Sequence, residues 1–221
     1  MFNNNNTKLK HLVKEVVKMK SKLLCLVFVM FVFCATNVWA ATSGTVNVNA
    51  VIPALSSGLT VTIIKIVGGK GGAWSVASAI NFGQLVRDPV NNIFTTGNPG
   101  FFYAVDASVL DNSGNDWTIT HTRASLKKDA VNDLDDNVNV SFCKVKKVPG
   151  EADSDISMDE LSFANSDGKF YKKSQLGGAG CWLRVYYGIA TGLGDAVGVV
   201  PIGIDKPAGS YAGTVTLTYS P

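Results

Sequence analysis

The sequence has few of the side chains on which metal sites and acid-base catalysis depend. Its 221 residues include four cysteines and two histidines, and beyond residue 40 the only histidine is His121. Structural zinc needs about four Cys or His ligands, and this part of the chain offers fewer. It also has no second histidine for general acid-base work. We therefore expect no metal, no cofactor and no enzymatic reaction.

Long apolar runs are also missing. The run at residues 23–33 is much shorter than the roughly 20 residues that a bilayer-spanning helix needs. Lys20 and Lys22 precede it, and Val38-Trp39-Ala40, an A-x-A-like sequence, follows it. A positive segment, a short apolar stretch and small residues at a cleavage site are the three parts of a secretory signal peptide. We expect cleavage between Ala40 and Ala41 and no membrane span afterwards.

Cleavage there divides the chain into a signal peptide, residues 1–40, and a single domain, residues 41–221. Met19 stands where a compact signal peptide would begin, so residues 1–18 are either an upstream extension or precede the true start. The roughly 180 residues that remain fall in the usual size range of one domain. The expected protein is secreted and reaches the periplasm, the outer surface or the extracellular medium.

A strongly basic character is absent from this domain. The whole chain has 20 Lys and Arg against 17 Asp and Glu, but residues 1–40 hold six of the basic residues and one of the acidic ones. The domain keeps 14 basic and 16 acidic residues, a net charge of about −2, and its basic residues occur in short pairs such as Lys127-Lys128. Because nucleic-acid-binding domains carry a basic patch or stripe, we expect no nucleic-acid partner.

Strand-forming and turn-forming residues are abundant. Val, Thr, Gly, Asn and Ser suit short strands joined by turns, and apolar residues alternate along residues 45–52. Residues 127–136 and 149–180 lack such patterns and are expected to be long surface connections, with one helical turn near residues 158–161. The expected strands are 45–52, 59–67, 80–85, 101–107, 117–123, 138–145, 181–187, 197–204 and 210–219. This spacing predicts an all-β, antiparallel β-sandwich.

The domain retains two cysteines in a compartment that favours disulfides. Cys25 and Cys34 lie in the signal peptide, and Cys143 and Cys181 remain. We expect these two to form a disulfide, which would stabilise the fold by roughly 4 kcal/mol. The alternatives are two free thiols or a catalytic thiol that uses His121 as its base.

Two ligand classes remain open from the residues. The acidic stretches 111–116 and 133–137 could surround calcium, although neither has the EF-hand order, and polar turns are the competing interpretation. A second group of residues is aromatic, and it would stack on a sugar if exposed or fill the core if buried. This group contains Trp74, Trp117, Trp182, Tyr186 and Tyr187.

Three segments carry a resemblance to a known group of proteins. They are residues 44–53 (GTVNVNAVIP), 80–85 (INFGQL) and 207–219 (PAGSYAGTVTLTY). Together they resemble bacterial secreted pilin-type proteins, and spore-coat-protein-U-like domains are the nearest group. The resemblance covers both ends of the domain and one middle segment. Leu55 lies where that group commonly has a cysteine after its first strand.

The resemblance implies an Ig-like or pilin-like sandwich that assembles into surface fibres by strand donation, through a periplasmic chaperone and an usher. Copies of the chain itself or related subunits would be its partners. The donated residues would be Val46, Val48, Ala50 and Ile52. We expect a non-enzymatic structural subunit of a pilus, coat or fibre. The alternatives are an adhesin or carbohydrate-binding module with a glycan partner, a self-complete sandwich without strand donation, and an enzyme whose site the sequence hides.

Overall fold

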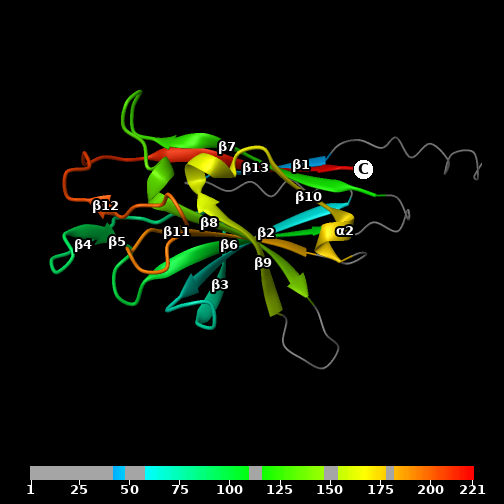
Figure 1. Cartoon of the computed structure of the whole chain (residues 1–221), viewed down its shortest axis with the longest axis horizontal. Coiled ribbons are helices and arrows are strands. Elements are labelled where there is room, and N and C mark those ends of the chain that lie inside the picture. Colours follow the sequence, from blue (N-terminus) through cyan, green and yellow to red (C-terminus); the bar gives the residue numbers. More distant parts are fainter. Residues whose placement is uncertain (1–41, 48–57, 110–115, 147–153, 178–181) are drawn as a thin grey trace, which may run out of the picture. The chain divides into compact units, whose positions relative to one another are not determined.

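Antiparallel strands make up most of the structure (Figure 1). It is a computed structural model that describes residues 42–47, 58–109, 116–146, 154–177 and 182–221, the first range by its backbone alone. All these residues belong to one unit, Ala40–Pro221. Every ladder between named strands is antiparallel. The predicted all-β class with antiparallel sheets is therefore confirmed.

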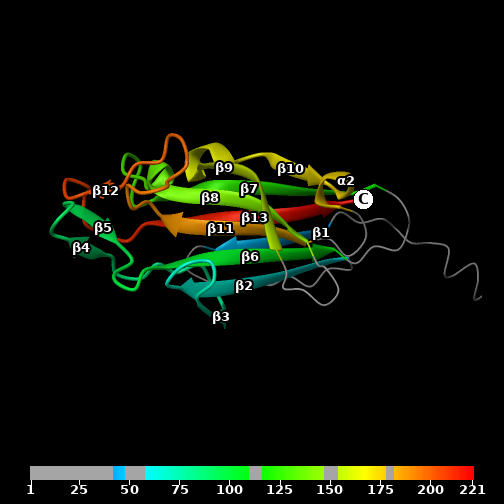
Figure 2. The same cartoon turned by 60° about the horizontal axis from the view of Figure 1, so that its bottom comes forward.

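The strands form three sheets. The large sheet has the order β3 (Ala73–Ala77), β2 (Leu59–Val67), β6 (Phe101–Val109), β11 (Trp182–Ile189), β8 (Val138–Lys146) and β9 (Ser154–Ser162). The second sheet has the order β1 (Thr42–Asn47), β13 (Ala212–Ser220), β7 (Thr118–Lys127) and β10 (Lys169–Lys172). The small sheet has the order β12 (Ile202–Gly203), β5 (Ile93–Thr95) and β4 (Val86–Asp88), and it lies at one end of the domain (Figures 1 and 2). Three short helical segments, η1 (Asp135–Asn137), η2 (Phe163–Ser166) and α2 (Lys173–Leu176), connect strands.

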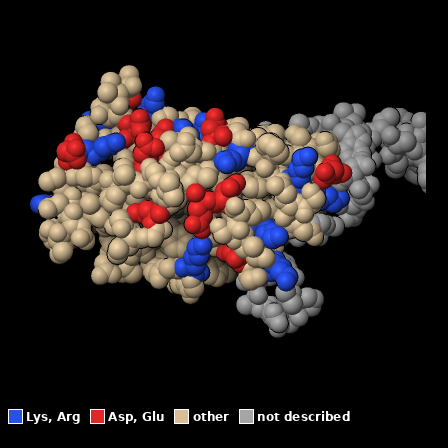
Figure 3. Space-filling model, in the orientation of Figure 1, with Lys and Arg blue, Asp and Glu red and all other residues tan. Residues whose placement is uncertain are grey.

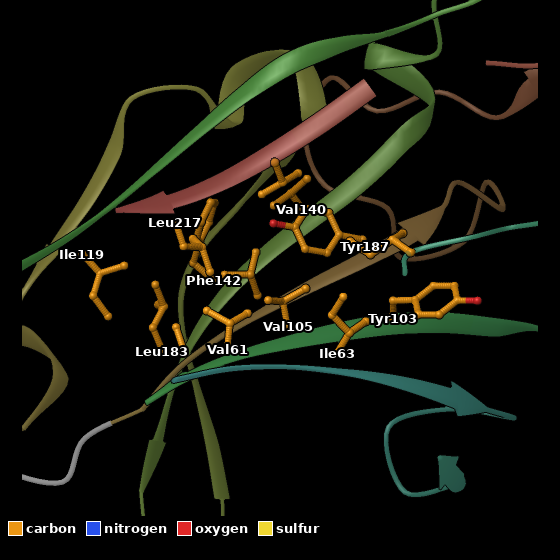
Figure 4. Close-up of a cluster of buried hydrophobic side chains, with 14 of the residues drawn as sticks. Val61, Ile63, Tyr103, Val105, Ile119, Val140, Phe142, Leu183, Tyr187 and Leu217 are labelled. Carbon is orange, nitrogen blue, oxygen red and sulfur yellow. The ribbon is translucent and has the colours of Figure 1, made fainter. Parts of the chain in front are cut away.

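The large sheet and the second sheet share one hydrophobic core, as a sandwich does (Figure 4). Val105, Phe142 and Leu183 contribute to it from the large sheet, and Ile119 and Leu217 from the second sheet. Strand alternation produces this arrangement, because every second side chain of a strand points to the same face. Each fully buried aliphatic or aromatic side chain contributes roughly 1.5–3 kcal/mol of transfer free energy.

Strands with a strong apolar pattern lie close to where the sequence predicts them. The range 59–67 matches β2, and the predictions at 101–107, 138–145, 181–187 and 210–219 match most of β6, β8, β11 and β13. The start of the prediction at 181–187 lies outside the described residues. The alternation along the last of these strands is confirmed, because Val215, Leu217 and Tyr219 are all buried.

The segment 149–180 was predicted as a surface connection, and in its described part this is wrong. It contains β9, η2, β10 and α2, and the predicted helical turn at 158–161 lies inside β9. Both strands are edge strands. An edge strand gains its ladder bonds from one neighbour and leaves many side chains in water, so its sequence needs no apolar run. β3, another edge strand, has four exposed residues and was missed for the same reason.

Two predicted strands are wrong. Residues 80–85 form no strand, although Ile80 is buried, and of residues 197–204 only Ile202–Gly203 pairs. Contacts with other parts of the chain hold both segments. The Tyr103 hydroxyl donates to the Asn81 carbonyl at 2.7 Å, and the Asn137 amide donates to the Val200 carbonyl at 2.9 Å. Ile80, Phe82 and Leu85 therefore pack against the core without a ladder. Of the second segment only Ile202 is buried, whereas Val197, Val200 and Ile204 are exposed.

Candidate functional site

The ladder between the first and last strands is the part of the structure on which the strand-donation hypothesis depends. β1 pairs with β13 in register from Thr42–Tyr219 to Asn47–Thr214. β13 pairs on its other side with β7. Among the described residues β13 is the only ladder partner of β1, which makes β1 an edge strand of the second sheet.

Of the four residues expected to be donated, only Val46 falls in the described part of the chain. It lies across the ladder from Val215, whose side chain is fully buried. Val48, Ala50 and Ile52 lie outside the described residues, as do the expected cleavage residues Ala40 and Ala41. The donation and the cleavage both stay predictions.

β1 and the strand that follows it belong to different sheets. β2 begins at Leu59 in the large sheet, and residues 48–58 join the two strands. Eleven residues of extended chain can span up to about 40 Å. In this structure β1 lies beside β13 of its own chain, and exchange of β1 between copies stays a prediction.

A pocket of about 620 Å³ lies beside the small sheet. Its floor consists of four buried aliphatic side chains, and its walls include half-buried aromatic rings and Lys206. The floor residues are Leu126, Leu134, Ile189 and Ile202, and the wall rings are Phe82, Phe94 and Tyr211. The volume falls in the range of small-molecule sites, which are mostly apolar with a few placed polar groups.

Two segments that carry the family resemblance meet at this pocket. Residues 81–85 line one part of its wall and residues 207–211 another. The Phe82 ring packs edge-on against Tyr103 with centroids 5.6 Å apart, and the Tyr211 hydroxyl donates to the Pro207 carbonyl at 2.7 Å. Sequence reasoning missed this pocket. The turn-rich composition of both segments marks them as irregular, but nothing local shows that they approach each other.

His121 lies in the core of the sandwich, where it is fully buried. Its Nδ1 donates to the Ser166 carbonyl at 2.7 Å, because a carbonyl can only accept, and its Nε2 accepts from the Tyr187 hydroxyl at 2.9 Å. Burial lowers the pKa of His121 to about 4. A neutral ring with both nitrogens paired and no exposure to solvent serves packing, and it is not placed to act as a base on Cys143, which lies in a separate apolar cluster.

Cys143 is buried on the outer face of the large sheet, and it has no disulfide partner among the described residues. Burial raises the pKa of this thiol, which makes it a poor nucleophile. Arg184 is the residue of β11 that lies across the ladder from it. Cys181 lies outside the described residues, so the disulfide between the two stays a prediction. Counting reactive thiols in the unfolded, unreduced protein tests it.

The five aromatic residues considered as a sugar platform do not form one exposed surface. Trp117, Tyr186 and Tyr187 are buried, Trp182 is half-buried, and only Trp74 is largely exposed. Beside Tyr186, the Arg184 guanidinium binds both oxygens of Asp106, at 2.6 and 2.7 Å. The Tyr186 hydroxyl donates to Asp155. These rings and ions are used for internal contacts.

The acidic stretch 133–137 is also used internally. Asp135 accepts hydrogen bonds from the Arg123 guanidinium, the Ser125 hydroxyl and the Leu126 amide. Within the described ranges, no group of three or more His, Cys, Asp or Glu could hold a metal ion. Residues 111–115 of the other acidic stretch lie outside those ranges.

Acidic and basic residues are interspersed on the face shown in Figure 3, without a large area of one sign. No helix in the described part of the chain is long and apolar enough to cross a membrane.

Comparison of the chain with protein-family models, with curated proteins and with solved structures found no match. The functional argument therefore depends on the ladder, the pocket and the sheet edges themselves.

Proposed function

We propose that this protein is a secreted, non-enzymatic structural subunit of a pilus-, coat- or fibre-like surface assembly. Its sandwich would be of the Ig-like or pilin-like kind, and its copies would join by exchanging β1. The observation that carries the proposal is that β1 is an edge strand whose ladder, among the described residues, is with β13 alone.

The energetics permit such an exchange. When β1 of one copy pairs with β13 of another, every ladder bond lost within a chain forms again between chains, so the net enthalpy change is small and concentration decides the balance. The buried β13 side chains Val215, Leu217 and Tyr219 give the incoming strand a fixed register. The resemblance to pilin-type proteins adds a periplasmic chaperone and an usher as proposed partners.

The test compares the full chain with a variant that lacks residues 42–52, and adds a synthetic peptide of residues 42–52. Light scattering is expected to show oligomers for the full chain that the variant does not form. The variant should bind the peptide in a one-to-one complex and unfold at a higher temperature with it.

A peptide with Val46→Lys is the matched control, because it places a charge across the ladder from the buried Val215. It should bind about tenfold more weakly or worse, since an unpaired charge that loses water costs more than 1.4 kcal/mol. Strand exchange is rejected if the full chain forms no oligomer that the variant lacks and neither peptide binds the folded variant.

A second candidate function is the binding of a small apolar ligand, which the pocket beside the small sheet favours. Its aliphatic floor and aromatic walls suit an apolar body, and Lys206 suits an anionic group. This lining is less suited to a glycan, whose hydroxyls need several polar partners. The pocket therefore supports the binding of a small apolar ligand and does not favour the adhesin alternative.

The probe 8-anilinonaphthalene-1-sulfonate, an anionic aromatic compound, tests this candidate. Its fluorescence should rise on binding the folded protein, and Lys206→Glu should weaken the binding by roughly tenfold through charge reversal. Lys146→Glu, an exposed change on β8, is the control and should leave binding unchanged. Equal effects of the two substitutions would rule out a specific site at Lys206.

A further inference from the structure

The two edges of the large sheet differ in how they are protected. At one edge, β9 carries Asp155, Asp159 and Glu160 and has an extra residue opposite the step from Phe142 to Cys143. Charges and bulges of this kind prevent an edge strand from pairing with another chain.

β3, at the other edge, has none of these features. Its sequence, Ala-Trp-Ser-Val-Ala, contains no charge, and its pairing with β2 runs through five residues without an irregularity. Trp74 is 67% exposed and Val76 is 70% exposed. β10, an edge of the second sheet, again differs from β3, because Lys169 and Lys172 lie at its two ends. An uncharged edge strand with exposed apolar side chains is a pairing surface.

The sequence of β3 is nearly symmetric about Ser75. If two copies pair antiparallel with Ser75 opposite Ser75, each Ala73 lies opposite Ala77 and each Trp74 lies opposite Val76 of the other copy. Pairs of an aromatic with a β-branched residue are among the favourable cross-strand pairs. β3 itself contributes no charge to this pairing.

The outer face of the large sheet continues the apolar surface of β3. Ladder register places Trp74 beside Ile66 and Val76 beside Ile64. Ile66 and Ile64 lie beside Phe102 and Ala104 of β6 in turn. The Phe102 ring packs edge-on against Tyr186, with centroids 5.6 Å apart. Two copies joined through β3 would therefore share one apolar strip across the junction of their sheets.

We propose that β3 is a docking edge for a second copy of this chain, which pairs antiparallel about Ser75 and joins two large sheets into one. This contact is separate from strand exchange, because β1 belongs to the second sheet and β3 to the large sheet. The two contacts can thus be tested independently, and in an assembly built through β1 the β3 contact would join neighbouring fibres.

The first experiment places single cysteines on the exposed edge. Ser75→Cys puts two thiols opposite each other in the proposed pair, at a cross-strand separation that suits a disulfide. Ala73→Cys, which would face Ala77, and Val90→Cys, on an exposed turn, are matched controls. Under mild oxidation Ser75→Cys should form disulfide-linked dimers about tenfold faster than either control, with the parent chain as the background for the native thiols.

The same cross-linking is repeated in the variant that lacks residues 42–52. Dimers through Ser75→Cys should still form there, because the β3 contact does not require β1. If Ser75→Cys cross-links no faster than Val90→Cys in the full chain, the β3 contact is wrong, whatever the state of strand exchange.

A charge substitution provides the second measurement. Val76→Lys should weaken self-association in sedimentation equilibrium by about tenfold in the variant that lacks residues 42–52. A lysine then replaces the valine opposite Trp74, and the two new charges stand at diagonal positions across the pair. Val90→Lys makes the same chemical change at an exposed valine outside β3 and should have no effect. An unchanged association constant for Val76→Lys, with a far-ultraviolet spectrum that matches the parent, overturns the proposal.

Discussion

The strands at the centre of the large sheet and the strands at its edges meet different surroundings. β6, β8 and β11 have ladder partners on both sides and core residues with almost no exposure, such as Val105, Phe142 and Leu183. β3 has one ladder partner and side chains that face water. In the second sheet, β1 likewise has its ladder with β13 alone among the described residues. The centre thus supplies most of the buried core, and the edges are where we propose that partners bind.

The centre and an edge can be compared with one chemical change. Phe142→Ala should lower the free energy of unfolding by about 3–5 kcal/mol, because Phe142 is fully buried and packs against His121 and Tyr171. Phe170→Ala on β10 should cost about 0.5 kcal/mol or less, since that ring is 56% exposed. Urea denaturation measures both. Similar losses of unfolding free energy for the two variants would contradict this difference between the centre and the edge.

The pH dependence of stability reports on the same centre. The pKa of His121 is lowered to about 4 in the folded protein, whereas an unfolded chain has an ordinary histidine pKa of about 6.5. Between these two pH values the unfolded chain binds a proton at His121 and the folded chain does not. The stabilising effect is complete above pH 6.5 and is lost as the pH falls from 6.5 towards 4. Between pH 6.5 and 5, before most carboxylates titrate, the free energy of unfolding should fall by about 2 kcal/mol.

His121→Gln is the control for this measurement, because glutamine does not titrate. Urea denaturation at pH 7, 6 and 5 should give a flatter profile for this variant than for the parent. A parent profile without a slope between pH 6.5 and 5 would show that His121 is accessible to protons in the folded state.

The same contrast explains how much the sequence could predict. Central strands such as β2 and β8 were found because burial requires apolar residues at regular spacing, and that pattern is local. β3 and β9 were missed because an edge strand is held by backbone bonds to a distant partner, which leave no pattern in its own residues. The alternate positions 117, 119 and 121 share one face of an extended strand, and Trp117, Ile119 and His121 are all buried. The hydrogen-bond partners of His121, Ser166 and Tyr187, 45 and 66 residues away, could not be predicted.

The pocket could not be predicted from the sequence either, because its lining comes from distant parts of the chain. Phe82, Phe94 and Tyr211 lie in three separate segments that meet only in the folded chain. Residues 80–85 were predicted to be a strand because they are apolar and short, and contacts such as the one between Asn81 and Tyr103 hold them in an irregular path.

The most direct measurement of strand exchange is a cysteine pair across the ladder of β1 and β13. Thr45 lies opposite Thr216, so Thr45→Cys with Thr216→Cys reports which chain supplies β1. After mild oxidation of the full chain, with the parent chain as the background for native thiols, strand exchange predicts a series of disulfide-linked dimers, trimers and larger products on a non-reducing gel. If the pair oxidises completely and every product is a cross-linked monomer, β1 completes its own sandwich and the proposed mode of assembly is wrong.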